Sequence, residues 1–243
     1  MAELYDTIGR TYGQLRRPEP RFEREILRAL GDSASVVNVG AGSGSYEPSD
    51  RRVIAVEPSL TMIRQRAAAA PPVVRGVAGA LPFRDESFDA ALAVLTIHHW
   101  PDRALGLAEL RRAARRRVVI LTHDPSLANF WLYEYFPEIP DIDSRSMPTL
   151  SQLSRELGRV TVVDLPVPHD CSDGFLGAYW RRPEAYLSER ARSAISMFSK
   201  LENVEERVAR LRADLASGEW RRRHGALLER ESLDVGYRLV IAA

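Results

Sequence analysis

The sequence is short of cysteine, of long hydrophobic runs and of an excess of either charge. Its single cysteine, Cys171, excludes an intrachain disulfide, and no Cys/His cluster has the spacing of zinc ligands, so no metal is expected. The longest apolar runs, such as residues 90–97, are far too short to span a bilayer. The first residues do not combine a basic stretch with an apolar one. We therefore expect a cytoplasmic protein without a membrane partner.

The near balance of charge limits the class of partner. Lys plus Arg number 34 against 33 for Asp plus Glu, a net charge of +1 that creates no long-range field for nucleic acid. A small-molecule substrate is favoured, and monomer and homodimer both stay open. With 243 residues, 45% of them hydrophobic, and no repeat or low-complexity linker, residues 1–243 are predicted to form one domain.

Residues 36–122 alternate short β-branched runs with helical stretches, a pattern typical of a parallel sheet covered by helices on both faces. Phe88–Leu95 is apolar without alternation, so it should be the central strand. The strands predicted in this part are Val36–Gly40, Arg52–Glu57, Val73–Val77, Phe88–Leu95 and Val118–Thr122. The fold class is α/β: a doubly wound, Rossmann-like, mostly parallel seven-stranded sheet with a helical cap insertion.

The flanking segments complete this domain. Residues 1–30 are predicted to form an N-terminal lid that ends in an amphipathic helix, Arg21–Leu30. In the second half, a short helix at Leu150–Leu157 leads to a strand at Val160–Val167, and the last strand is Val235–Ala242.

Between the last two strands, residues 169–233 are predicted to form a helical insertion that covers the substrate pocket. Its apolar residues recur every three or four positions, as a core-facing helix requires; they are Leu201, Val204, Val208, Leu211 and Leu215. The aromatic residues Trp131, Tyr133, Tyr135, Tyr179 and Trp180 could line an apolar pocket, although packing of the cap is the commoner role.

A Gly-x-Gly-x-Gly turn follows the first strand, at Gly40, Gly42 and Gly44. Such a turn lies at the carboxyl edge of the sheet, where open α/β sheets bind ligands, and glycine lets a ligand approach bare backbone. The second strand ends in Glu57, where a carboxylate can accept hydrogen bonds from ribose hydroxyls. A glycine turn alone is often purely structural. Together with Glu57 it indicates an adenosine-containing ligand.

The ligand should lack phosphate. The dinucleotide fingerprint Gly-x-Gly-x-x-Gly is not matched, because the third glycine comes one residue early. Only eight residues separate Gly44 from Val53, which leaves no room for a long helix whose N-terminus would hold a pyrophosphate.

Four ordered motifs between Tyr5 and Asp124 resemble one family. They are Val36-Val37-Asn38-Val39-Gly40-Ala41-Gly42-Ser43-Gly44, Ala55-Val56-Glu57-Pro58-Ser59 with Met62, Ala80-Leu81-Pro82-Phe83-Arg84-Asp85-Glu86-Ser87-Phe88-Asp89, and His98-His99-Trp100 followed by Asp102. The chain resembles the class I S-adenosylmethionine-dependent methyltransferases, in the bacterial branch related to ubiquinone and menaquinone biosynthesis.

This resemblance implies S-adenosyl-L-methionine as the cofactor and assigns residues to each part of it. Gly40, Ala41 and Gly42 would hold the methionine part, and Glu57 with Pro58 the ribose. The adenine would contact Met62, Ala78 and Leu81, while Thr96 to His98 would flank the sulfonium. Arg17 would meet the cofactor carboxylate, with Tyr5 and Tyr12 on a closing N-terminal lid.

The sequence departs from the family pattern before its Leu-Pro-Phe motif. Family members commonly have an aspartate there that bonds the adenine amino group, whereas this chain has Val77, Ala78 and Gly79. Adenine would then be held by backbone and apolar contacts.

Methyl transfer from a sulfonium is an in-line displacement, so the protein mainly aligns and desolvates the nucleophile. A nucleophile that carries a proton gains from a base, and histidine is suited to that role near neutral pH. Three pairs follow predicted strands: His98-His99, His123-Asp124 and His169-Asp170. Of these, His98 and His169 are the candidate catalytic residues, although His98 could instead only satisfy a backbone carbonyl beside the cofactor.

Two arginine clusters bear on alternative functions. Arg111-Arg112 with Arg115-Arg116-Arg117 is predicted to end the helix after Asp102, where cations complement the helix dipole, rather than to contact RNA. The same holds for Arg221-Arg222-Arg223-His224. The function predicted is methyl transfer to an O, N or C nucleophile of a small molecule. The alternatives are a methyltransferase for tRNA or protein, and a catalytically silent nucleoside-binding module.

Overall fold

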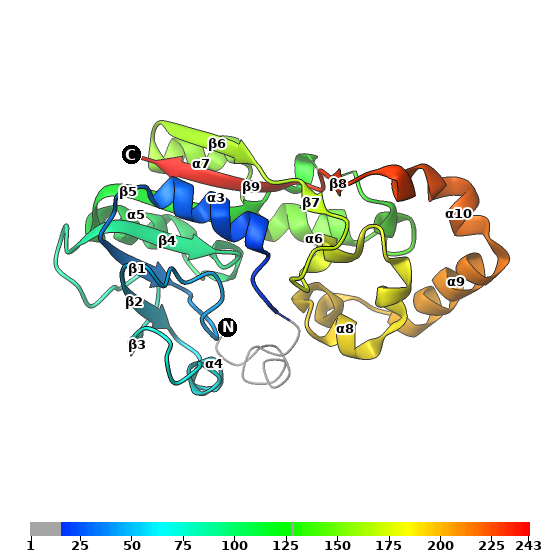
Figure 1. Cartoon of the computed structure of the whole chain (residues 1–243), viewed down its shortest axis with the longest axis horizontal. Helices are drawn as coiled ribbons and strands as arrows, with labels where there is room; N and C mark the ends of the chain where they lie inside the picture. The colour runs from blue at the N-terminus through cyan, green and yellow to red at the C-terminus, as the bar shows by residue number, and fades with distance from the viewer. Residues whose placement is uncertain (1–15, 128) are drawn as a thin grey trace.

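The computed structural model describes residues 16–127 and 129–243, which form a twisted sheet flanked by helices (Figure 1). The predicted lid residues Tyr5 and Tyr12 lie outside this part of the chain. The sheet has seven strands in the order β3-β2-β1-β4-β5-β9-β6. They are β1 (Ser35–Val39), β2 (Arg52–Glu57), β3 (Val73–Arg75), β4 (Phe88–Val94), β5 (Ala114–His123), β6 (Val160–Asp164) and β9 (Tyr237–Ala242).

The first five strands run parallel, and only β9 is antiparallel to its neighbours β5 and β6. The predicted class, a mostly parallel doubly wound seven-stranded sheet, is therefore confirmed. Strand β4 occupies the centre, and all but two of its residues are buried. Its unalternated apolar sequence predicted this position because both faces of a central parallel strand are covered.

Helices cover the two faces of the sheet with separate apolar cores. On one face, α3 (Pro20–Leu30) packs with Phe22 and Ile26 against residues such as Val36 and Leu92. On the other face, α5 (Arg103–Ala113) and α7 (Leu150–Leu157) pack against the alternate strand residues, among them Val37 and Ala91. Successive strand side chains point to opposite faces, so each strand contributes to both cores.

The ends of these helices follow from local sequence. The Glu19 carboxylate accepts the Arg21 amide and Pro20 occupies the first turn of α3, where its missing N–H costs nothing. Helix α7 begins with a capping box in which Thr149 and Gln152 accept each other's backbone N–H groups. These signals placed both predicted helices within one residue of their observed bounds.

Three predictions about the elements were wrong in detail. The strand predicted at Val73–Val77 ends at Arg75, before Gly76. The strand predicted at Val160–Val167 ends at Asp164, since Pro166 has no N–H for the ladder. Arg115 to Arg117 do not end a helix: α5 stops at Ala113, and these arginines lie in the exposed first half of β5.

The predicted helical insertion, residues 169–233, is a chain of short helices rather than one stretch. The α-helices in it are α8 (Glu189–Ser193), α9 (Val204–Ser217) and α10 (Glu219–His224), joined by 3-10 turns. Val208 and Leu211 of the predicted stripe are fully buried, and Leu201, Val204 and Leu215 pack against the same core. The two-residue strands β7 (Val167–Pro168) and β8 (Ser232–Leu233) pair where the insertion begins and ends.

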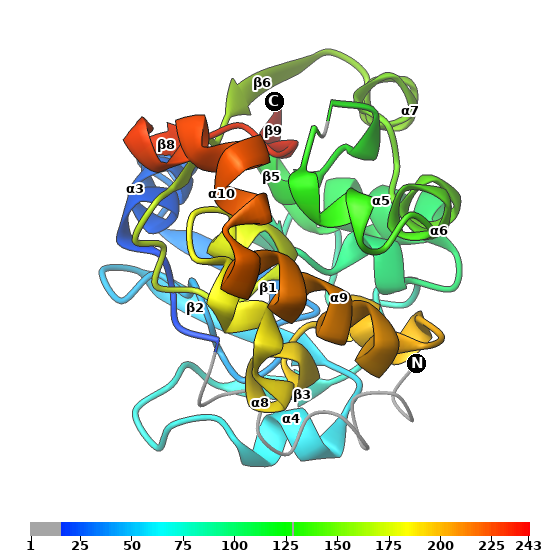
Figure 2. The same ribbon diagram turned by 90° about the vertical axis from the view of Figure 1, so that its right-hand side faces the viewer.

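In Figure 1 the parallel strands point toward the side of the molecule that carries α6 (Ile139–Ser146) and the insertion. Figure 2 views the molecule from that side, and α8, α9 and α10 lie in front of the strands. The insertion therefore stands at the carboxyl edge of the sheet. Across residues 16–127 and 129–243, no helix is both long enough and apolar enough to cross a membrane.

Candidate functional site

The glycine turn after β1 needs glycine for two separate reasons. Gly40, Gly42 and Gly44 all have positive φ angles, of 73°, 54° and 98°, which side chains other than glycine rarely adopt. In addition, a Cβ on Gly40 would lie only 2.1 Å from Thr96 Oγ1, whereas one on Gly42 would meet only the Met62 methyl, at 3.3 Å. The first glycine thus allows the loop after β4 to approach the loop after β1.

The amide groups of this turn are already bonded within the protein. The Gly40 and Ala41 N–H groups both donate to the Val56 carbonyl, at 2.8 and 3.1 Å, and the Gly44 N–H donates to the Ala41 carbonyl at 3.0 Å. A phosphate-binding loop instead leaves such groups free to point at its ligand. The arrangement therefore agrees with the expectation of a ligand without phosphate.

Glu57 at the end of β2 is 6% exposed and organises the surrounding backbone. Its Oε2 accepts the Gly42 N–H at 2.8 Å, and its Oε1 accepts the Ser59 N–H at 2.9 Å. Each carboxylate oxygen can accept a second hydrogen bond. Glu57 can thus join the glycine turn to the start of α4 (Leu60–Arg64) and still receive hydroxyl groups from a ligand.

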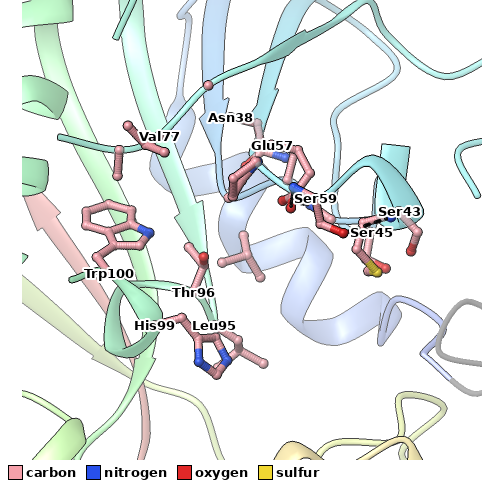
Figure 3. A pocket seen from close by; sticks show the side chains of 18 of the residues that line it. Asn38, Ser43, Ser45, Glu57, Ser59, Val77, Leu95, Thr96, His99 and Trp100 are labelled. Carbon is pink, nitrogen blue, oxygen red and sulfur yellow. Dashed lines mark hydrogen bonds between the residues drawn. The ribbon is translucent and has the colours of Figure 1, made fainter. Parts of the chain in front are cut away.

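A cavity of about 250 Å³ opens between the glycine turn, Glu57 and the loop after β4 (Figure 3). In Figure 3, Val77 and Trp100 form one wall, with Glu57 and Ser59 opposite and Thr96 and His99 below. The walls offer mainly apolar surface beside one buried carboxylate. This combination suits a nucleoside, whose base needs apolar contact and whose ribose needs an acceptor.

Most of the residues that the sequence assigned to the cofactor meet at this cavity. Those that line it are Gly40, Ala41, Gly42, Glu57, Pro58, Met62, Ala78 and Thr96. Leu81 does not line it: its side chain is buried in the sheet core, and its N–H donates to Glu109. Arg17 is exposed and outside the lining, and Tyr12 lies outside the described residues.

The neighbouring Arg16 takes the place expected of Arg17. It lines the cavity, and its Nε donates to Asp173 Oδ1 at 2.6 Å. Asp173 is 1% exposed and also accepts the Tyr46 hydroxyl at 2.8 Å. Because Asp173 lies in the distant insertion, sequence spacing could not reveal this pair. Asn38, Val77 and Trp100 also line the cavity without having been predicted as site residues.

A second cavity of about 70 Å³ adjoins the first, since Arg16, Leu95 and His99 line both. It lies where β4 and β5 end and where the insertion faces them. Its polar lining residues are Arg16, His98, His99, His123, Asp143, Ser146, Ser196, Lys200 and Tyr237. The first cavity is therefore suited to a cofactor and the second to an acceptor beside it.

The histidines of the second cavity are held neutral. Burial, with the nearby Lys200 and Arg16 charges, lowers the pKa of His98 well below its usual value and that of His99 to about 4. The His98 and His99 ring centroids are 3.8 Å apart. At neutral pH these imidazoles are proton acceptors that add no positive charge beside a cationic ligand.

His169 is the predicted catalytic residue that this site does not include. It lines neither cavity, its side chain is 36% exposed, and its Nε2 lies 3.3 Å from Glu231 at the β7–β8 pair. His98 lines the second cavity, and His99, at the junction of the two cavities, was named only as its neighbour.

Asp143 of α6 was not predicted as part of any site. It is 2% exposed, yet it lines the second cavity, and its Oδ2 lies 4.0 Å from His123 Nδ1. Burial raises the pKa of its carboxyl to about 7. One signal was readable: Asp143 follows Ile139 by four positions and so shares its buried helix face.

The arginine clusters are largely paired within the protein. Arg112 bonds Glu109 and Asp85, and Arg116 bonds Asp32. In the second cluster Arg223 bonds Glu134 and Asp214. Arginines already paired with carboxylates have less positive charge to offer a phosphate backbone. Among the described residues, no group of three or more His, Cys, Asp or Glu side chains could hold a metal ion.

Comparison with known proteins places this geometry in context. Residues 37–122 match a protein family described as "Methyltransferase domain". No curated protein sequence matches the chain. A crystal structure from Anabaena variabilis, described as a candidate methyltransferase from an antibiotic biosynthesis pathway, is 34% identical over 95% of this chain and 99% of its own, with a TM-score of 0.89.

Two further solved structures share the fold at lower identity. An S-adenosylmethionine-dependent methyltransferase from Thermotoga maritima, described as a candidate histamine N-methyltransferase, is 23% identical over 68% of this chain and 84% of its own, with a TM-score of 0.55. The [4+2]-cyclase SpnF is 12% identical over 99% of this chain and 93% of its own, with a TM-score of 0.54.

Proposed function

Because the chain belongs to the class I S-adenosylmethionine-dependent methyltransferases, we propose that it methylates a small organic molecule held in the second cavity. The observation that carries this proposal is the junction of the two cavities at His99 and Leu95. An acceptor site of this small size supports a metabolite rather than a macromolecule. The narrower relation to the ubiquinone and menaquinone branch stays a prediction.

The first cavity fits the cofactor that the family uses. Glu57 would receive the ribose hydroxyls, Met62 and Val77 would contact the adenine, and Arg16 would meet the methionine carboxylate. When bound, S-adenosylmethionine supplies a methyl group already activated on sulfur. The protein then has to bind the acceptor, orient its nucleophilic atom and exclude water.

His99 is the side chain best placed to handle a proton in this reaction. It is 8% exposed and lines both cavities, and its low pKa keeps it an acceptor at neutral pH. We assign it the hydrogen bond to the nucleophile's O–H or N–H group, with His98 beside it. Residues 169–233 would exclude water from the second cavity. We give His169 no part in the mechanism.

The alternatives have weaker support. An RNA substrate would be favoured by unpaired arginines around the cavities, whereas the two clusters are mainly paired with carboxylates. A module that binds the cofactor without methyl transfer keeps its place as the second hypothesis, since the same fold also occurs in a cyclase.

Cofactor binding and transfer of labelled methyl groups distinguish the three functions. Calorimetry with S-adenosylmethionine should show binding to the purified protein, and incubation with methyl-labelled cofactor and a metabolite extract should transfer label to a small molecule. Absence of cofactor binding at millimolar concentration would overturn the proposal. Binding without transfer to any small molecule would favour the silent module, and label in RNA or protein would favour a macromolecular substrate.

We expect His99→Gln to lower kcat by about 10²-fold for an acceptor that must lose a proton, the lower end of the range for a lost base, because the pKa of His99 is low. Cofactor affinity should change less than threefold. Wild-type kcat should be flat above about pH 5 and fall as His99 is protonated near pH 4. The partly exposed His169, substituted in the same way, is the control. Full kcat in His99→Gln would mean that the protein only orients the acceptor.

A further inference from the structure

The second cavity contains a buried carboxylate that its surroundings do not satisfy. Asp143 Oδ2 has no hydrogen-bond partner among the described residues, although the side chain is only 2% exposed. Leaving a buried acceptor without a partner costs roughly 1–3 kcal/mol, and more for a charged group. Such a group in a cavity indicates a ligand that completes it.

The neighbouring His123 does not supply the missing donor. Its Nε2 lies 2.9 Å from the Val235 carbonyl, which can only accept, so the proton of a neutral ring is on Nε2. Burial lowers the pKa of His123 to about 4, so the ring is neutral at pH 7. Nδ1, which faces Asp143 Oδ2 at 4.0 Å, is then a second acceptor. When Asp143 is ionised, two acceptors therefore face each other without a donor.

The charges around Asp143 favour a cation over a neutral donor. The groups that interact with it are His123 from β5, Tyr133, Tyr237 from β9 and Lys200. His123 is neutral, and burial raises the pKa of both tyrosines, so they are neutral as well. The charge of Lys200 acts on Asp143, but Lys200 is exposed, and water weakens this attraction. A bound hydroxyl would leave the buried carboxylate without a counter-charge.

The other residues that line the cavity indicate what the ligand carries besides the cation that binds Asp143. Its apolar lining comes from Leu95, Met147, Phe175, Leu176, Ile195 and Met197. Arg16, the other cation at the cavity, is paired with Asp173. The cavity thus offers apolar walls with one acidic end.

We propose that Asp143 is the substrate-anchoring residue, and that the acceptor molecule is a small, largely apolar amine whose protonated nitrogen binds between Asp143 Oδ2 and His123 Nδ1. This inference rests on the proposed function and narrows its substrate class. The anchored ammonium has no lone pair for the methyl group. The methylated atom is therefore another atom of the molecule, or this nitrogen after it has lost a proton.

Three probes test the inference: benzylamine, its isostere benzyl alcohol, and toluene, which lacks the polar group. Their dissociation constants are measured by ligand-observed NMR in the presence of S-adenosylhomocysteine. We expect the wild-type protein to bind benzylamine at least tenfold more tightly than benzyl alcohol. Benzylamine affinity should rise about tenfold from pH 6 to pH 8 as Asp143 ionises with its pKa near 7.

Asp143→Asn should remove both the preference for benzylamine and its pH dependence. Asp141→Asn, an exposed position on the same helix, is the matched control and should change neither. Equal binding of benzylamine and benzyl alcohol to the wild-type protein, or retention of the preference in Asp143→Asn, would overturn the inference. Failure to bind S-adenosylhomocysteine would instead contradict the proposed function, so the two failures are distinguishable.

Discussion

Glu57→Gln is expected to weaken S-adenosylmethionine binding about 100-fold, the loss of one or two hydrogen bonds to a charged group. The substitution removes the charge that receives the ribose hydroxyls. It also replaces one carboxylate oxygen by an NH₂ group. This group is a donor and cannot accept the N–H of Gly42 or of Ser59 that the oxygen accepts. Both the contact with the cofactor and the shape of the glycine turn are therefore affected. Isothermal calorimetry at constant salt measures the change.

Glu109→Gln is the control for this effect. Glu109 is also a partly buried carboxylate that accepts a backbone N–H, that of Leu81, and it pairs with Arg112, but it lines neither cavity. It should cost stability without changing cofactor affinity by more than twofold. Unchanged affinity in Glu57→Gln would refute our placement of the cofactor. Equal losses in the two variants would mean that Glu57 acts through folding alone.

The elements of the sheet were predictable because their signals are local. The unalternated run of β4, the proline and glutamate before α3, and the capping box of α7 each lie within a few neighbouring residues. Where the prediction failed, a backbone restriction was underestimated, as at Pro166, which ends β6. The helical insertion was recognised by apolar residues that recur every three or four positions. Its division into short helices depends on packing against a distant core.

The site was predictable to the extent that its residues follow strands. The glycine turn, Glu57 and His98 lie at strand ends or within a few residues of them, and these ends meet at one edge of a parallel sheet. Arg16 and Asp143 could not be placed in this way. Arg16 is positioned by Asp173, 157 residues away. Asp143 lies on α6, and how deeply its side chain is buried depends on how that helix packs. His169 follows β7, which pairs with β8 outside the main sheet, so the same rule pointed to a position away from both cavities.

Asp143 should also make the unliganded protein less stable as the pH rises. Its pKa is raised by burial from 3.8 to about 7, so the folded state binds the proton more tightly than the unfolded state. The free energy of unfolding therefore falls between pH 4 and pH 7, by about 1.4 kcal/mol per pH unit, and levels off above pH 7. Across pH 5 to 7 the loss should be about 2 kcal/mol, because Asp143 is already half ionised at pH 7.

Comparison with Asp143→Asn isolates this contribution. The amide cannot ionise, so the difference in unfolding free energy between the variant and the wild-type protein should grow by about 2 kcal/mol in favour of the variant from pH 5 to pH 7. Urea unfolding at each pH measures it, and the other titrating groups cancel in the difference. If the unfolding free energies of the two proteins changed with pH in parallel, Asp143 would have an ordinary pKa. A rising difference would mean that the unliganded fold bears the cost of a buried, uncompensated carboxylate at Asp143.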